Sequence, residues 1–127
     1  MNRNLLFALS LTLALAVSFI AGCAGIATYT DPSQTINATV NGEFAIALDS
    51  NPTTGYSWNV SYDASLLSLE KEEYTPDKTE PGLVGAGGTQ RYQFKALKAG
   101  STEINLTYLR TWEEGYIDQK VFTVTIS

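Results

Sequence analysis

Few side chains in this sequence could carry out chemistry on a substrate. The chain has 127 residues, no histidine and one cysteine, Cys23. Catalysis by a serine or cysteine paired with histidine is therefore excluded, as are histidine-ligated metals. The best remaining acid–base candidates are the adjacent carboxylates Glu113 and Glu114, but neighbouring side chains on a strand face opposite ways. We therefore expect no catalytic residues, no enzyme activity, no cofactor and no metal.

The segment from Asn51 to Trp58 has the residue types of a stiff loop that leads into a strand. Pro52 fixes its own φ and disfavours the helical region for the residue before it, and Gly55 can take a positive φ. The two threonines between them are β-branched and stiff about χ1. Such a loop loses little entropy when it enters the cleft of a partner. The simpler alternative is a Pro-Gly turn that only closes a hairpin.

The N-terminus has the pattern of a signal peptide over residues 1–22, with a positive start followed by a long apolar stretch. Its end, Ile20-Ala21-Gly22-Cys23, resembles the lipobox of bacterial-type lipoproteins, in which the cysteine is lipidated and becomes N-terminal. We expect an exported protein, lipid-anchored to the cell membrane at Cys23 and facing outside the cytoplasm, with residues 23–34 as anchor site and tether. An uncleaved membrane anchor and a secreted protein with one chance cysteine are the alternatives.

The remaining chain is acidic and has no thiol beyond the predicted anchor. Residues 24–127 hold seven basic and thirteen acidic side chains, a net charge of −6. This balance argues against nucleic acid as a partner. No disulfide is expected, so the core must be held by packing alone.

The apolar residues from position 35 onward alternate with polar ones, the period of a β-strand. Seven strands are expected, at residues 36–40, 44–48, 56–60, 67–74, 92–96, 104–108 and 122–126. They predict an all-β domain at residues 35–127, an immunoglobulin-like β-sandwich of about seven strands. Asn41-Gly42 is a strong hairpin signal between the first two strands, and Trp58 is expected to be the buried aromatic of the core.

The connections after the second, fourth and sixth strands have unusual compositions. In a chain that runs up and down, these loops, at residues 51–55, 75–89 and 110–118, lie at the same end, which predicts a protein-binding surface. The second loop contains Gly85-Ala86-Gly87-Gly88, which is typical of close backbone approach to a partner, of a phosphate cradle or of a flexible linker. The third contains Arg110-Thr111-Trp112, whose tryptophan is either an interface anchor or a core residue.

Together the three loops resemble those of the chagasin family of cysteine protease inhibitors. That family carries N-P-T-T-G-[FY], G-x-G-G and R-P-W loops, in this order, on an immunoglobulin-like domain. Here the first motif is intact from Asn51 to Tyr56 and the second from Gly85 to Gly88. Thr111 replaces the usual proline of the third motif, so we expect that loop to be less stiff. The resemblance spans essentially residues 35–127.

The resemblance implies reversible, non-covalent inhibition of papain-like cysteine proteases by a monomer. The first loop would enter the catalytic cleft, with Thr53 and Thr54 near the protease cysteine. The glycine loop would lie along the substrate-binding side, and Trp112 would pack on the leaving-group side. The implied protease-binding residues are Asn51, Pro52, Thr53, Thr54, Gly55, Tyr56, Gly85, Ala86, Gly87, Gly88, Arg110, Thr111 and Trp112. A surface adhesion or ligand-binding module that uses the same loops for another partner is the alternative.

Overall fold

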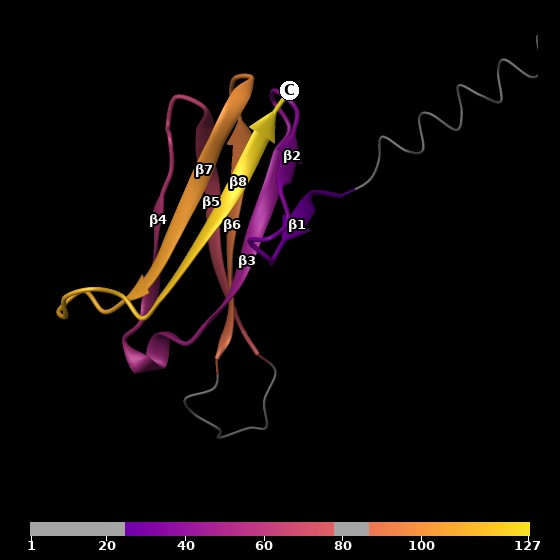
Figure 1. Cartoon of the computed structure of the whole chain (residues 1–127). Helices are drawn as coiled ribbons and strands as arrows, with labels where there is room; N and C mark the ends of the chain where they lie inside the picture. The colour runs from indigo at the N-terminus through magenta and orange to yellow at the C-terminus, as the bar shows by residue number, and fades with distance from the viewer. Residues whose placement is uncertain (1–24, 78–86) are drawn as a thin grey trace, which may run out of the picture.

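The computed structural model of the chain describes residues 25–77 and 87–127, which form two four-stranded sheets packed face to face (Figure 1). The first sheet has the order β1-β3-β6-β5, with β1 (Ala27–Tyr29), β3 (Glu43–Ser50), β6 (Gly88–Ala96) and β5 (Leu67–Pro76). The second has the order β2-β8-β7-β4, with β2 (Ile36–Ala38), β8 (Asp118–Ile126), β7 (Gly100–Leu109) and β4 (Ser57–Ser61). The predicted all-β sandwich is confirmed, with eight strands in the described residues where about seven were expected.

Phenylalanine side chains fill the centre of the sandwich. Phe44 and Phe94 of the first sheet are stacked with their ring centroids 5.6 Å apart, and Phe122 faces them from the second sheet, fully buried. Trp58, the aromatic that the sequence predicted for this position, is only partly buried at the margin of the core. Its indole nitrogen donates a hydrogen bond to the Asp49 carbonyl at 2.9 Å. The prediction for Trp58 was therefore wrong, because the indole N–H needs an acceptor that the apolar centre does not offer.

The Asn41-Gly42 turn does not close the predicted hairpin. Asn41 takes the positive φ of 68° that such a turn requires, and the Gly42 amide donates to the Thr39 carbonyl at 2.8 Å. However, the turn carries the chain from one sheet to the other, and β2 pairs in parallel with β8 rather than with β3. A tight turn fixes where the chain reverses, but it does not determine which neighbour each strand pairs with.

The first strand lies within the segment that the sequence assigned to a tether. Residues Ala27–Tyr29 pair in parallel with the first half of β3, with Ala27 opposite Phe44. Regular structure therefore begins before the predicted domain boundary at residue 35. The predicted signal peptide and Cys23 lie outside the described residues. Among the residues that are described, no helix is long and apolar enough to cross a membrane.

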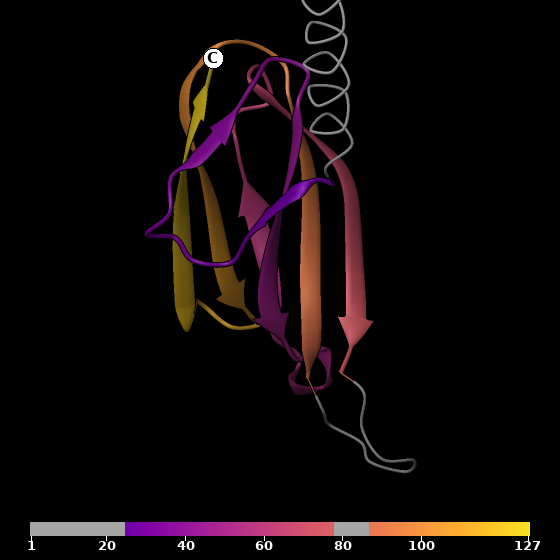
Figure 2. The same ribbon diagram turned by 90° about the vertical axis from the view of Figure 1, so that its right-hand side faces the viewer.

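The described parts of the three unusual loops lie together at one end of the sandwich (Figures 1 and 2). They follow β3, β5 and β7, which all run toward this end. The strand registers agree, because Ser50, at the end of β3, is opposite Gly88, and Gly88 is opposite Pro76, at the end of β5. In the second sheet, Ser57 at the start of β4 pairs with Leu109 at the end of β7. The predicted clustering of loops is thus confirmed for their described parts.

Candidate functional site

The loop after β3 folds into a single turn of 3₁₀ helix, Pro52–Thr54 (η1). The residue before the proline, Asn51, has φ −136° and ψ 87°, outside the helical region as expected. Gly55 ends the turn in the left-handed conformation with φ 85°, and its amide donates to the Pro52 carbonyl at 3.0 Å. The two conformational predictions made from the sequence of this loop are confirmed.

Both threonine hydroxyls of this loop hold the turn closed. The Thr53 hydroxyl donates to Asn51 Oδ1 at 2.5 Å, and the Thr54 hydroxyl donates to the Asn51 carbonyl at 2.7 Å. The Thr54 hydroxyl oxygen also accepts from the Tyr56 amide at 3.3 Å. At the base, the Asn51 amide donates to the hydroxyl of Tyr108 in β7 at 2.9 Å, which fixes the loop to the second sheet. The loop is therefore stiff through its own hydrogen bonds, while Pro52 and both threonines remain exposed at its tip.

Arg110, at the start of the third loop, joins that loop to the first. Its Nε donates to the Thr54 carbonyl at 3.0 Å, and its Nη1 pairs with Glu113 Oε1 at 3.0 Å. Its guanidinium also lies 4.2 Å from the ring centroid of Tyr56 and 5.9 Å from that of Trp112. Both distances are within the range of cation–π attraction. The Arg110 side chain thus contacts the Thr54 carbonyl of the first loop, the Glu113 carboxylate of its own loop, and one aromatic ring of each of these two loops.

Trp112 is exposed over 69% of its surface and lies against Gly55. A Cβ atom on Gly55 would come within 2.9 Å of Trp112 Cζ2, so the glycine is needed for this contact as well as for its φ. The alternative of a core tryptophan at this position is excluded by its exposure. The indole presents a large apolar surface to the outside, and its other side lies against Gly55 of the first loop.

Aromatic rings connect these loops to the core. The Tyr56 ring stacks on Tyr108 with centroids 5.4 Å apart, and Trp58 lies on Tyr108 at 4.7 Å. Below them, the Tyr92 hydroxyl donates to the Trp58 carbonyl at 3.4 Å. Burial raises the pKa of the Tyr92 phenol, so this group remains a neutral donor at any physiological pH. Stacked rings therefore support the first and third loops from inside the sandwich.

The described part of the glycine loop lies beside the first loop. A Cβ atom on Gly87 would be 3.1 Å from the Ser50 carbonyl oxygen, and one on Gly88 would be 2.6 Å from the Tyr74 hydroxyl. Gly88 in particular leaves no room for a side chain, because β5 and β6 approach each other closely there. Gly85 and Ala86 lie outside the described residues. A shallow hollow separates the two loops, lined by Asp49, Ser50, Asn51, Asp77, Gly87, Gly88 and Tyr108.

The structure brings the described members of the predicted site together, but it also adds residues that sequence reasoning missed. Tyr108 anchors and stacks under the first loop, and Glu113 holds Arg110. The signal for Tyr108 was present, because its position in the alternating pattern of Ile104 and Leu106 turns it inward. No pattern in the sequence identified Glu113, which was considered only as a catalytic candidate.

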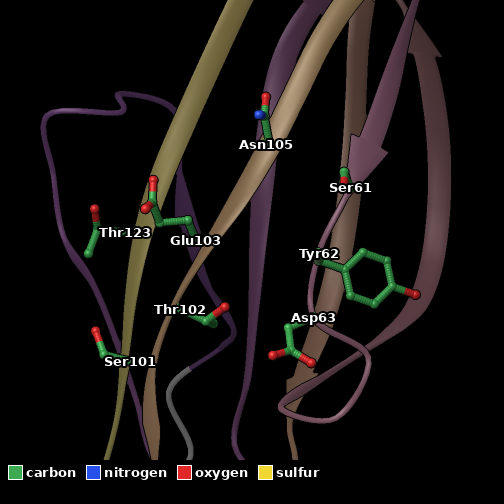
Figure 3. A pocket seen from close by; sticks show the side chains of 8 residues that line it. All are labelled: Ser61, Tyr62, Asp63, Ser101, Thr102, Glu103, Asn105 and Thr123. Carbon is green, nitrogen blue, oxygen red and sulfur yellow. The ribbon is translucent and has the colours of Figure 1, made fainter.

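A second hollow lies away from the loops, on the outer surface of the second sheet (Figure 3). It is open and polar, and its lining includes two carboxylates, Asp63 and Glu103. Asp63 accepts hydrogen bonds from the amide and hydroxyl of Ser65, at 2.9 and 2.6 Å, and these bonds lower the pKa of its carboxyl. Asp63 therefore holds the turn between β4 and β5.

Comparisons with known proteins give the loop end a context. The sequence profile of the family described as "Chagasin family peptidase inhibitor I42" matches residues 37–126. Amoebiasin-2 of Entamoeba histolytica is 36% identical over 90 residues, covering 71% of this chain and 73% of that protein. Chagasin of Trypanosoma cruzi is 35% identical over 96 residues, covering 71% of this chain and 84% of that protein.

Solved structures agree with the sandwich. The crystal structure of the cysteine protease inhibitor EhICP2 from Entamoeba histolytica matches with a TM-score of 0.70 at 31% identity, over 80% of this chain and 96% of that one. The structure of PbICP-C in complex with falcipain-2 matches with a TM-score of 0.53 at 21% identity, over 82% of this chain and 95% of that one. At the lower identity the likeness concerns the fold alone. The predicted immunoglobulin-like fold class is confirmed.

Proposed function

The chain belongs to the chagasin family of peptidase inhibitors, and we propose that its three clustered loops inhibit papain-like cysteine proteases by a reversible, non-covalent block of the catalytic cleft. As a member of an inhibitor family, the protein is not an enzyme.

The closed 3₁₀ turn at residues 52–54 is the observation that carries this mechanism. A protease acts on a peptide bond whose reacting atoms it can bring into attack geometry. In this loop the Thr54 amide and hydroxyl both donate to the Asn51 carbonyl, and the Thr53 hydroxyl is bonded to the Asn51 side chain. Opening the turn into an extended substrate would break these bonds together. The loop therefore occupies the cleft without presenting a scissile bond.

The neighbouring loops supply the remaining contact. By resemblance to the family, Gly85 to Gly88 would lie along the substrate-binding side of the cleft and Trp112 on the leaving-group side. Large exposed aromatic residues are typical interface hot spots, and Trp112 is held in place by Gly55 and Arg110. Together with the glycine loop, the preorganised first and third loops on one rigid scaffold are enough for a standard interface of roughly 800 Å² per partner.

Inhibition constants of the purified protein against papain-like and trypsin-like proteases test this proposal. We expect inhibition of the papain-like class alone, because the shape of the closed turn at residues 52–54 fits one cleft geometry. The inhibitor should also stay intact during the assay, as judged by its mass. Equal inhibition of both classes, or steady cleavage between Thr53 and Thr54, would contradict the mechanism.

We further propose that the protein is exported and anchored to the outer face of a membrane by lipid on Cys23. The support is the apolar leader that ends in Ile20-Ala21-Gly22-Cys23 and the lack of any other cysteine in the sequence. Cys23→Ala should leave the protein unprocessed or released, whereas Ser18→Ala, within the apolar stretch, should not. Membrane fractionation and the mass of the mature protein measure this. Unchanged membrane retention and mass of the Cys23→Ala variant would reject the lipid anchor.

A further inference from the structure

The third loop exposes more apolar surface than Trp112 alone. Among the described residues, six large hydrophobic side chains are exposed, and three of them belong to this loop: Trp112, Tyr116 and Ile117. Tyr116 is 54% exposed and Ile117 is 62% exposed. The other three, Ile26, Val40 and Leu97, lie in turns and chain segments at the far end and are only 39–41% exposed. The strongest exposure of apolar side chains is therefore concentrated at the proposed inhibitory end.

Tyr116 and Ile117 are held by hydrogen bonds despite their exposure. The Ile117 amide donates to the Tyr108 carbonyl at 2.9 Å, which continues the pairing of β7 with β8 by one more residue. The Tyr116 hydroxyl donates to Gln119 Oε1 at 3.2 Å, and Gln119 Nε2 in turn donates to Asn105 Oδ1 at 3.0 Å. The two side chains are thus presented from a fixed backbone, which lowers the entropy cost of docking.

Packing within the protein does not account for the pair. Neither residue belongs to the described core or to the side chains packed against it. Acidic residues flank the pair on both sides, at Glu114 and Asp118. An apolar centre with a charged rim is the composition of a protein–protein contact. The pair also shares its loop with Trp112, so it extends the proposed inhibitory surface rather than starting a new one.

We propose that Tyr116 and Ile117 form a second apolar anchor for the same protease, which docks on apolar surface beside the catalytic cleft while the first loop fills the cleft itself. This inference rests on the proposed function and adds a residue pair that the three family motifs do not contain. Its consequence concerns selectivity. A contact outside the cleft separates proteases that share a catalytic centre but differ in the surface around it.

The double variant Tyr116→Ser/Ile117→Ser tests the anchor. The inhibition constant against papain should rise by about tenfold, chiefly through faster dissociation of the complex. The matched control is Val40→Ser/Leu97→Ser, which removes exposed apolar side chains at the opposite end and should leave the inhibition constant within twofold. Near-UV circular dichroism and thermal unfolding of each variant fix the concentration of folded inhibitor, so that a folding defect is not counted as weaker binding.

The outcomes separate the two proposals. A wild-type protein that does not inhibit papain overturns the proposed function and this inference with it. If the wild type inhibits papain and the inhibition constant of the double variant rises less than fivefold, the second anchor alone is overturned. An equal rise for the control variant overturns it as well.

The triple variant, with Trp112→Ala added to the double variant, tests whether the two contacts are independent. The fold-increases in the inhibition constant should multiply, because independent contacts add in free energy. A combined effect no larger than that of Trp112→Ala alone would show that the pair acts only through Trp112. Wild-type dimers in sedimentation that disappear in the double variant would assign the pair to self-association instead.

Discussion

Replacement of Arg110 by lysine would test whether the first and third loops act as one preorganised unit. Lysine keeps the positive charge and can still pair with Glu113, but it has no Nε–H to donate to the Thr54 carbonyl and no planar group to lie over Tyr56. The substitution therefore removes the contacts between the loops while it leaves the charge of the surface unchanged. If these contacts preorganise the site, the affinity for the protease should fall more than the stability of the fold.

The structure sets the size of the expected effect. A hydrogen bond to a charged group contributes about 1.5–3 kcal/mol, and we take about 1 kcal/mol here because the Arg110 side chain is 30% exposed. Cation–π attraction at such a site adds about 0.5 kcal/mol. The sum of about 1.5 kcal/mol corresponds to roughly a tenfold rise in the inhibition constant. The ion pair with Glu113 is left out, because lysine retains it.

Inhibition of papain by Arg110→Lys and by a matched control, Arg91→Lys, measures the effect. Arg91 lies in the middle of β6 and its guanidinium donates to Gln93, away from the loops. We expect a change in the inhibition constant below twofold for the control. For Arg110→Lys we expect a loss of unfolding free energy that is smaller than its loss of binding free energy. An Arg110→Lys variant that inhibits as well as the wild type would refute the preorganisation argument. A melting temperature that falls in step with affinity would instead make Arg110 a residue of general stability.

Other substitutions probe the same end of the molecule. Trp112→Ala should weaken inhibition by about 2 kcal/mol, some thirtyfold, with no loss of melting temperature, because the indole is exposed; a sharp drop in melting temperature would contradict this. Gly55→Val should cost about 1–3 kcal/mol of affinity, since a β-branched residue at φ 85° is strained and its Cβ meets Trp112; inhibition constants equal to wild type would show that the loop relaxes freely. Thr111→Pro should improve affinity by about 0.4–1 kcal/mol, partly through faster association. Thr111 follows Arg110 in a turn that the Glu113 amide closes by donating to the Arg110 carbonyl at 3.1 Å, and proline favours this position of a turn. A loss of affinity above about 1 kcal/mol would show that the bound loop has a different conformation.

The strands could be predicted from the sequence because burial alternates along them. In β8, for example, Phe122, Val124 and Ile126 are buried while Thr123 and Thr125 are exposed. The partners of short strands could not be predicted in the same way. β1 has no fully buried residue, and of its three residues Tyr29 packs against the core, so its sequence shows no apolar period.

The composition of the site could be predicted better than its internal contacts. The Pro-Thr-Thr-Gly order determined the turn at residues 52–55, because proline and glycine restrict the backbone locally. The bond from Arg110 to the Thr54 carbonyl joins residues 56 positions apart, so only the folded sandwich brings them together. The stacking of Tyr56 on Tyr108 has the same origin, since it depends on the pairing of β4, which follows the first loop, with β7.

The placement of β1 also determines how the inhibitor would be displayed. Ala27 is opposite Phe44, and β3 continues from there for six residues before it reaches the first loop, a length of about 20 Å. The chain therefore enters the sandwich behind the loops, and β1 runs parallel to β3 toward them (Figure 2). A protease held at the loop end would face away from whatever precedes Ala27. A force that pulls the bound protease and the chain before Ala27 apart would load the β1–β3 pair in shear along the strands. In this direction all hydrogen bonds of the pair resist together.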